Sequence, residues 1–290
     1  MVHLPLMHLI HPYGKQQRRR NRDSRDSWQR YAEHRERVTQ ILCGPAENRS
    51  RLLSVWGAGN GNDLDLRRLL QAFSAIHLYD LDHEALQFAV DQQSLQETPS
   101  IVLHGGIDLM GAADILVSPA EVSRDPVDPD PLLRRLRAAR LSPPCPRSDV
   151  VASVCLLSQL IEASATWLGG HHPRLMEVIT EVRRQHLRLM FQTTRPGGRT
   201  VLITEILSSD TLPDLAALPG VTLQRDLIQQ VNAQNFYTGL NPAVLESIAH
   251  RDPELGRLCD GFIAHEPWRW DFGPRAYAVA AFETRTIGHG

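Results

Sequence analysis

A short glycine-rich segment has the residue types and spacing of a ligand-binding loop. Gly57, Gly59 and Gly61 follow the apolar run 51–56 and precede a segment of helical periodicity. Glycine in such a turn lets the backbone approach a ligand closely and adopt φ values that other residues avoid. The spacing is GxGxG rather than the dinucleotide fingerprint GxGxxG, because position 62 is Asn62, and no P-loop lysine follows. Taken alone, the spacing also fits a purely structural turn.

Two aspartates stand in register with this glycine segment. Asp80 ends the second apolar run, about twenty residues beyond the glycines, and Asp108 follows the third run. A carboxylate at the end of the second strand can accept hydrogen bonds from both hydroxyls of an adenosine ribose. One after the third strand can accept from the amino group of adenine. Each aspartate could instead cap the next helix, but their common register with the glycines favours an adenosine-containing cofactor.

The elements that must position these residues alternate regularly along the chain. Apolar runs predict five strands, and amphipathic segments between them predict helices, the strongest at 174–194. This alternation is typical of right-handed βαβ crossovers and a parallel sheet with helices on both faces. Ligands bind such sheets at the carboxyl ends of the strands. The predicted strands cover residues 51–56, 75–79, 100–105, 149–157 and 199–207.

The pattern changes after the fifth predicted strand. Residues 210–260 are rich in helix and loop signals, and two further strand-like runs follow at 261–266 and 276–285, joined by the turn 267–275. We therefore expect an α/β fold with a Rossmann-like, doubly wound, seven-stranded sheet. Five strands would be parallel, and the last two would form a C-terminal antiparallel hairpin.

The predicted organisation has three parts. Residues 1–25 contain the charged run RRRNRDSRDS and are expected to form a flexible basic arm. Residues 26–48 are expected to form an N-terminal helical extension, with Ser27 as its cap. Residues 49–290 would form the Rossmann-like domain, with a helical cap insertion at about 208–260.

Composition narrows the class of protein. The 290 residues are 42% hydrophobic with a net charge of −2, which favours a sizeable core and gives no general reason to expect a nucleic-acid or membrane partner. The four cysteines form no CxxC pair, and the 13 histidines suggest no metal site. The apolar start and basic end of the first twenty residues reverse the order of a signal peptide. We expect a cytoplasmic protein without a metal, whose oligomeric state is not predicted.

A family resemblance joins these observations. The motifs VWGAGNGNDL, LYDLDHEAL, GGIDLMG, DVVASVCLLSQL and RPGGRTVLITE succeed one another as in class I (Rossmann-like) S-adenosylmethionine-dependent methyltransferases, which the chain resembles over roughly residues 50–207. The resemblance implies S-adenosylmethionine as cofactor and a transferase activity. By this resemblance, the cofactor's methionine portion would contact Gly57, Ala58 and Gly59, its ribose Asp80 and its adenine Leu81 and Asp108, with a floor at Ser153, Val154, Cys155 and Leu156 and further contacts from Gly61, Asp63, Asp82, Ile107 and Leu109.

One position departs from the family pattern. The family often has an acidic residue two positions before the first glycine, where this chain has Val55. That carboxylate helps organise the loop and the cofactor's amino group. Asp63, Asn60 or Asn62 could replace its function, so the methionine end of the site is where this protein differs from the pattern.

Candidate acceptor residues lie outside the sheet. The segment 232–242 falls between the fifth and sixth predicted strands, a region that commonly covers the active site in this fold. Tyr237 could orient an acceptor or contact the sulfonium through its ring. We expect Tyr237 and Asn235 to be catalytic and Tyr31, Asn232 and Asn241 to contact the substrate or form a lid, although Asn-Pro and Thr-Gly are also turn dipeptides.

Several functions remain open on sequence alone. The first is methyl transfer to oxygen or nitrogen of a small molecule, as in specialised metabolism; no NPPY-type motif follows the fourth predicted strand. The second is a reaction at the aminocarboxypropyl arm of the cofactor, either transfer or cyclisation to azetidine-2-carboxylate, which releases methylthioadenosine. The third is a non-catalytic module that binds the cofactor or RNA, supported by the basic stretches RRRNR and RRLRAAR. The misplaced third glycine disfavours an NAD-dependent oxidoreductase.

Overall fold

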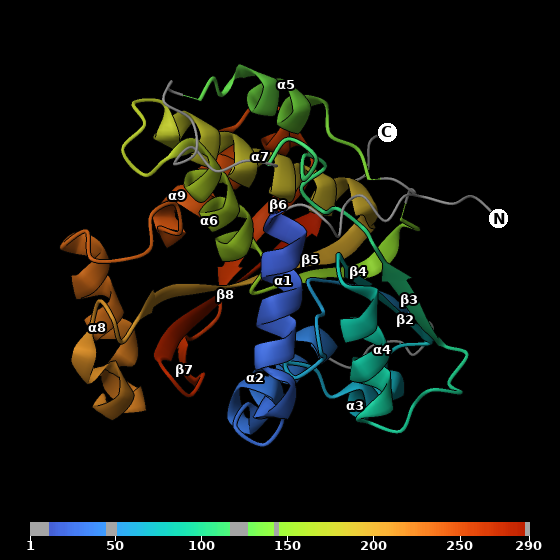
Figure 1. Ribbon diagram of the computed structural model, residues 1–290. Helices are drawn as coiled ribbons and strands as arrows, with labels where there is room; N and C mark the ends of the chain where they lie inside the picture. Colours follow the sequence, from blue (N-terminus) through green and yellow to red (C-terminus); the bar gives the residue numbers. More distant parts are fainter. Residues whose placement is uncertain (1–11, 45–50, 117–126, 142–144, 288–290) are drawn as a thin grey trace.

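Five apolar runs form parallel strands at the centre of the computed structural model, which describes residues 12–44, 51–116, 127–141 and 145–287 (Figure 1). The strands lie in the order β3-β2-β1-β4-β5-β8-β6, and β7 pairs with β8. β8 runs antiparallel to β5, β6 and β7. The strands are β1 (Leu52–Trp56), β2 (Ala75–Asp80), β3 (Ile101–Gly105), β4 (Ser148–Val154), β5 (Thr194–Ser208), β6 (Cys259–Ala264), β7 (Trp268–Asp271) and β8 (Ala276–Thr286).

This order confirms the predicted Rossmann-like sheet, with one strand more than the seven predicted. The additional strand is β7, in the segment 267–275 that the sequence predicts to be a turn. Its residues alternate between the two faces, and Trp270 is buried while Arg269 and Asp271 are exposed. Burial of one tryptophan face against the domain is enough to hold this short strand on β8.

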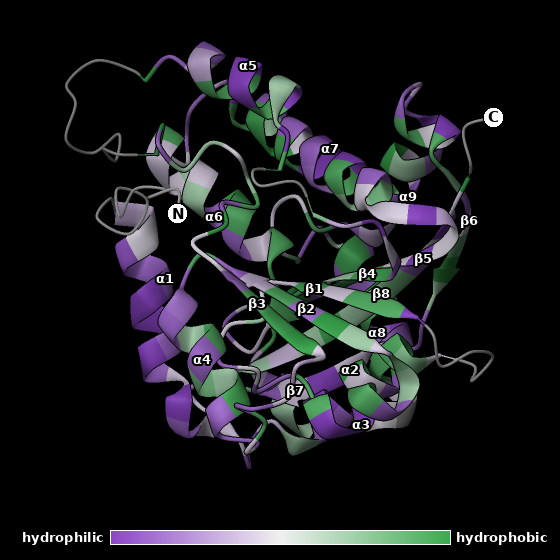
Figure 2. Cartoon of the chain, turned by 90° about the vertical axis from the view of Figure 1, so that its right-hand side faces the viewer, coloured by the Kyte–Doolittle hydropathy of each residue, from purple (hydrophilic) through white to green (hydrophobic). Residues whose placement is uncertain are grey.

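Helices cover both faces of the sheet, as Figure 2 shows. α5, α6, α7 and α9 pack on one face, whereas α2, α3, α4 and α8 lie on the other, and each face has its own cluster of buried apolar side chains. None of the helices in the described part of the chain is long and apolar enough to cross a membrane. The helices are α1 (Pro12–Asp23), α2 (Ala32–Cys43), α3 (Leu66–Ala72), α4 (His83–Asp91), α5 (Asp130–Ala138), α6 (Leu157–Leu168), α7 (Leu175–Thr193), α8 (Gly220–Asn232) and α9 (Pro242–Arg251).

The N-terminal region differs from the predicted flexible arm. Residues 1–11 lie outside the described residues, but residues 12–23 form α1, which spans the edge of the sheet between the two helix layers (Figure 2). Its buried face consists of Tyr13, Gly14 and Gln17 rather than aliphatic residues. The apolar periodicity that reveals most helices is therefore missing from the sequence. α2 also begins later than predicted, because Ser27 lies in a 3-10 turn and the helix starts at Ala32.

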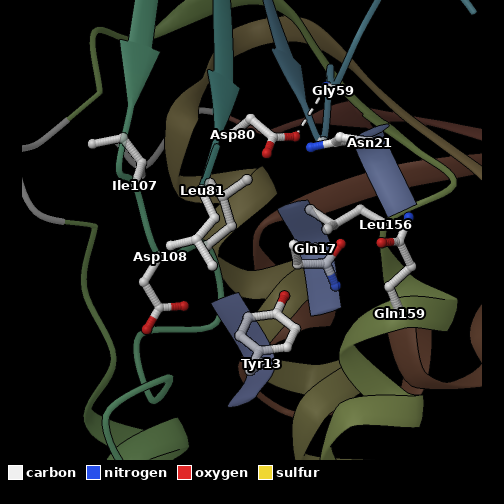
Figure 3. A pocket seen from close by; sticks show the side chains of 12 residues that line it. Tyr13, Gln17, Asn21, Gly59, Asp80, Leu81, Ile107, Asp108, Leu156 and Gln159 are labelled. Carbon is white, nitrogen blue, oxygen red and sulfur yellow. Dashed lines mark hydrogen bonds between the residues drawn. The ribbon is translucent and has the colours of Figure 1, made fainter. Parts of the chain in front are cut away.

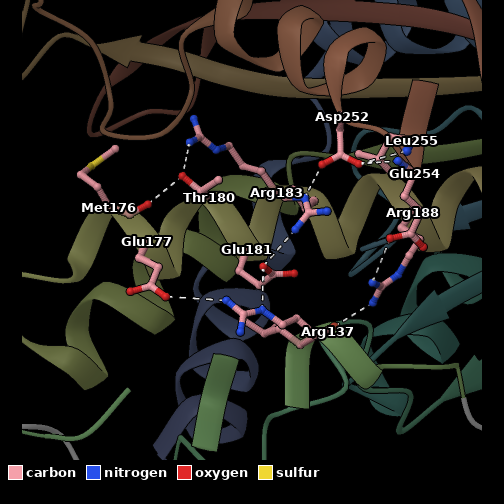
Figure 4. A network of polar contacts seen from close by, with 12 residues as sticks. Arg137, Met176, Glu177, Thr180, Glu181, Arg183, Arg188, Asp252, Glu254 and Leu255 are labelled. Carbon is pink, nitrogen blue, oxygen red and sulfur yellow. Dashed lines mark hydrogen bonds and ion pairs between the residues drawn. The ribbon is translucent and has the colours of Figure 1, made fainter. Parts of the chain in front are cut away.

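Ion pairs fix the long helix α7 between its neighbours (Figure 4). Glu181 accepts from Arg137 of α5 at 3.2 Å and from Arg184 at 3.3 Å, and Arg184 also donates to Asp252 after α9. Arg137 and Arg184 are partly exposed, whereas the Glu181 carboxylate is buried. Desolvation of that carboxylate offsets much of the attraction in these pairs. The network therefore fixes the positions of α5 and α9 more than it adds stability.

A buried arginine connects the sheet to α2. Arg199 of β5 donates from Nε and Nη2 to the two carboxylate oxygens of Glu283 on β8, at 2.8 and 2.7 Å. The same guanidinium donates to the carbonyls of Ile41 and Leu42, which end α2 without helical partners. Burial alone would raise the pKa of Glu283, but the hydrogen bonds from Arg199 and the nearby His265 ring lower it to about 2.

Replacement of this arginine tests the connection. Arg199→Met leaves the Glu283 carboxylate buried without its partner, so we expect the free energy of unfolding at pH 7 to fall by about 3–5 kcal/mol. Urea denaturation measures the change. The matched control is Arg195→Met, which breaks a partly exposed pair with Asp149 and should lower the free energy of unfolding by less than about 1 kcal/mol. Equal losses in the two variants would contradict this account.

Candidate functional site

A pocket lies at the carboxyl edge of the sheet where β1, β2 and β3 end (Figure 3). Parallel strands bring their carboxyl ends to one edge, so residues far apart in the sequence meet there. The pocket brings together these predicted residues: Gly57, Gly59, Asp80, Leu81, Ile107, Asp108, Leu109 and Leu156. It is also lined by four residues that sequence reasoning missed: Tyr13, Gln17, Asn21 and Gln159.

The glycine segment needs glycine for two different reasons. Gly57 has φ +75°, and a Cβ there would lie 2.9 Å from Leu156 Cβ, so glycine lets the loops after β1 and β4 meet at the pocket floor. Gly61 has φ +65°, and a Cβ there would lie 2.7 Å from Ala89 Cβ of α4. Gly61 therefore permits helix packing and does not line the pocket, whereas Gly57 and Gly59 do.

Asp80 is held at the pocket wall by backbone donors. Its Oδ2 accepts from the N–H of Gly59 at 2.9 Å, and its Oδ1 accepts from the N–H of Asp82 at 2.9 Å. Burial raises the pKa of Asp80 to about 6, although these two hydrogen bonds oppose the rise. Each carboxylate oxygen keeps a lone pair, so Asp80 can still accept two hydroxyl hydrogen bonds.

Asp108 both closes the turn after β3 and lines the pocket, the two roles that its position in the sequence allows. Its oxygens accept from the N–H groups of Met110 at 2.9 Å and Ala113 at 2.7 Å, so it closes the turn after β3. The same side chain lines the pocket opposite Tyr13 of α1. Burial, and next the charge of Asp108, raise the pKa of the Tyr13 hydroxyl, so this phenol stays protonated.

α1 forms the outer wall of the pocket. Tyr13, Gln17 and Asn21 are spaced four residues apart and share the helix face that Figure 3 shows turned toward Asp80 and Asp108. Gln17 is only 7% exposed, and its Nε2 has no hydrogen-bonding partner among the described residues. This spacing within a charged run is the one signal that could have identified the helix from the sequence.

Asparagines of the glycine loop hold α1 in place. Asn60 donates to the carbonyl of Asn21, and Asn62 donates to the carbonyl of Ser24 at 2.7 Å. Asn21 in turn donates to Asp82 at 3.1 Å. The amide groups of Asn60 and Asn62 thus bind the N-terminal segment, which differs from the sequence expectation that they could replace the carboxylate missing at Val55.

The other predicted cofactor contacts lie beneath or beside the pocket. Ser153 is fully buried in β4, and its hydroxyl pairs with His186 Nε2 at 2.8 Å. Asp82 contacts α1, as described above. The residues predicted as contacts that do not line the pocket are Ala58, Gly61, Asp63, Asp82, Ser153, Val154 and Cys155.

The predicted acceptor residues do not line this pocket, and they separate into the three asparagines and the rings of Tyr31 and Tyr237. Asn241 caps α9 by accepting from the N–H groups of Ala243 and Val244, and Asn235 donates to Gln230 and to the carbonyl of Thr211. Both are turn or cap residues here, and neither lines the pocket. Asn232 is exposed at the end of α8. Tyr31 is buried beside Trp270, and Tyr237 lies next to Tyr277.

Metal ligands do not gather in the part of the chain that the structure describes. Residues 12–44, 51–116, 127–141 and 145–287 contain no group of three or more histidine, cysteine, aspartate or glutamate side chains that could hold an ion.

No family model matches the sequence, and no curated protein matches it. Among solved structures, N-methyltransferase NodS from Bradyrhizobium japonicum WM9 in complex with S-adenosyl-L-homocysteine is 10% identical with a TM-score of 0.45, covering 98% of this chain and 92% of that one. An O-methyltransferase family protein from Burkholderia thailandensis is 14% identical with a TM-score of 0.47, covering 97% and 64%. TrmN from Thermus thermophilus is 13% identical with a TM-score of 0.42, covering 87% and 48%.

The contact between the two loops at the pocket floor is testable. Gly57→Ala places a methyl group against Leu156 in a left-handed backbone conformation. We expect the free energy of unfolding, measured by urea denaturation, to fall by about 2–4 kcal/mol. Gly106→Ala is the matched control, because Gly106 has a similar φ of +74° but no atom within 4 Å of the added Cβ. Its free energy of unfolding should fall only by the cost of the left-handed backbone conformation, about 1–2 kcal/mol. An equal fall in the free energy of unfolding of Gly106→Ala would contradict this explanation.

Proposed function

We propose that the chain is an S-adenosylmethionine-dependent methyltransferase that acts on a small-molecule acceptor. One observation carries the proposal: the Asp80 carboxylate at the end of β2 faces the glycine loop after β1, in a pocket that also contains Asp108 after β3. This is the arrangement in which an α/β sheet holds an adenosine at its carboxyl edge.

The pocket residues fit this cofactor. Asp80 offers free lone pairs to the ribose hydroxyls, and Leu81 and Ile107 offer buried apolar surface to the adenine ring. Gln17 also lines this pocket, and its buried Nε2 lacks an acceptor among the described residues. A bound adenosine would supply such an acceptor, which explains why a polar amide is buried there.

The chain's own groups would align the reactants and exclude water. The bound cofactor supplies an electrophilic methyl group, and transfer requires an in-line approach of the acceptor rather than covalent catalysis by the protein. α1 covers the pocket with Tyr13 and Gln17 and shields it from solvent. The glycine loop leaves the side facing β4 and β5 for the acceptor.

Product analysis tests the proposed reaction. The protein is incubated with S-adenosylmethionine and a panel of small acceptors, and the adenosine-containing product is identified by mass spectrometry. S-adenosylhomocysteine marks methyl transfer. Methylthioadenosine would instead mark a reaction at the aminocarboxypropyl arm and would overturn the proposal.

Removal of the Asp80 charge should weaken cofactor binding. Asp80→Asn loses two charged hydrogen bonds to the ribose, and we expect the Kd for S-adenosylhomocysteine to rise about 10–100-fold in isothermal titration calorimetry. Asp91→Asn removes the same charge from an exposed position on α4 and serves as the control. An unchanged Kd in Asp80→Asn would place the cofactor elsewhere.

The raised pKa of Asp80 predicts a pH dependence of binding. Because only the ionised carboxylate accepts from both hydroxyls, the affinity for S-adenosylhomocysteine should be full above pH 7 and fall as the pH drops through about 6. The expected loss between pH 7 and pH 5 is about tenfold. Calorimetry at several pH values checks the profile, which should become flat in Asp80→Asn.

A further inference from the structure

A second group of buried titratable side chains lies at the same edge of the sheet. Asp63 follows the glycine loop, Cys155 follows β4, and Glu205 lies just beyond the part of β5 that pairs with β4. β1, β4 and β5 are neighbours in the sheet, and the charge of Glu205 acts on Asp63 while both charges act on Cys155. Cys155 and Glu205 belong to strands on the other side of β1 from β2, which ends at Asp80.

The two carboxylates lack a cationic partner. Glu205 is 8% exposed and accepts one hydrogen bond, from the Ser158 hydroxyl at 2.8 Å. Asp63 Oδ1 is buried without a hydrogen-bonding partner. In the described part of the chain, neither forms an ion pair with an arginine or lysine, although the charge of Arg35 acts on Asp63 and that of Arg20 on Glu205. Burial raises the pKa of both carboxyl groups to about 7, and the charge of Glu205 contributes to the rise at Asp63.

His34 independently indicates that a polar partner is missing beside Asp63. The imidazole is 1% exposed, and its Nδ1 accepts from Trp268 Nε1 at 3.0 Å, so the proton must be on Nε2. Burial lowers the pKa of His34 to about 3, and the ring is neutral. Its Nε2 has no hydrogen-bonding partner and points toward Asp63 Oδ1 from 3.5 Å. A buried donor and a buried acceptor are thus both unsatisfied at one place.

Aromatic rings surround the carboxylates. The Trp270 ring lies 4.9 Å from Tyr31 and 5.4 Å from Tyr277, and Tyr277 lies 6.5 Å from Tyr237. The charge of Asp63 acts on the Tyr31 hydroxyl, and that of Glu205 acts on Tyr237 and Tyr277. Aromatic faces and carboxylates both attract cations.

We propose that Asp63, Glu205 and the tyrosine and tryptophan rings around them form the acceptor subsite, and that the acceptor is an amine bound as its ammonium cation. This inference rests on the proposed methyltransferase function. An ammonium group would neutralise the buried charge and would offer donors to both carboxylates. A carboxylate acceptor would be repelled, and a neutral alcohol would leave the charge uncompensated.

The proposed step balances in protons and electrons. The ammonium group gives one proton to the Asp63–Glu205 pair, which leaves a lone pair on nitrogen. That lone pair forms the bond to the methyl carbon, while the electrons of the breaking carbon–sulfur bond remain on sulfur. The methylated nitrogen then carries the positive charge, and the carboxylate pair returns its proton to solvent.

The test uses three probes of similar size: benzylamine, benzyl alcohol and benzoate. The melting temperature of the full chain, saturated with S-adenosylhomocysteine, is measured with each probe. We expect benzylamine alone to raise it and expect Glu205→Gln and Asp63→Asn each to weaken the apparent Kd for benzylamine at least about tenfold. The control Glu246→Gln, exposed on α9, should behave as the wild type. Equal stabilisation by benzyl alcohol or benzoate, or no response to benzylamine, overturns the inference.

Two further measurements distinguish an acceptor subsite from a cofactor contact and from a structural pair of carboxylates. If S-adenosylhomocysteine does not bind the wild type, the proposed function itself fails. If Glu205→Gln loses S-adenosylhomocysteine but keeps methylthioadenosine, the pair binds the cofactor's own amino group and the acceptor assignment is wrong. Without ligands, Glu205→Gln should melt at a higher temperature than the wild type, because it removes a buried charge. A lower melting temperature would indicate a structural carboxylate instead.

Discussion

Parallel pairing of β1 with β2 on one side and with β4 on the other determines where every part of the site lies. In a parallel sheet, all strands end at the same edge, and each loop leaves from there toward a covering helix. The glycine loop follows β1, Asp80 ends β2, and Glu205 lies in β5 just beyond its pairing with β4, so all three lie at this edge. The helices and the antiparallel β8 matter for function because they keep this edge in place.

The carboxylates of the structure show how burial and hydrogen bonding oppose each other. Glu283 is buried with a bidentate arginine, and its pKa is lowered to about 2. Asp80 is supported by two backbone donors, which only partly offset its burial, and its pKa is about 6. Glu205 accepts a single hydroxyl, and its pKa reaches about 7. The order follows the number and charge of the donors.

The sequence predicted those parts of the site that depend on local pattern. Strand ends, the glycine turn and Asp80 are readable because apolar runs end where the sheet ends. α1 could not be predicted in this way, because its buried face is made of tyrosine, glycine and glutamine. The burial of polar groups depends on partners elsewhere in the chain. The partnership of Asp63 with Glu205 could not be predicted either, because it arises from strand order rather than from spacing. Likewise, Asn235 and Asn241 have side chains suited to binding but satisfy backbone groups of the fold, the carbonyl of Thr211 and the first N–H groups of α9.

Polar contacts hold the C-terminal half of α1 over the pocket. Asn60, Asn62 and Asp82 bind its C-terminal end, and Arg20 binds Glu162 of α6 at 2.7 Å. Water can replace such partners at little net free energy, so this helix can detach far more easily than the domain unfolds. We expect a molecule bound beneath it to leave when the helix detaches. The rate at which α1 detaches would then set the residence time of the product. The same rate would limit the maximum turnover rate.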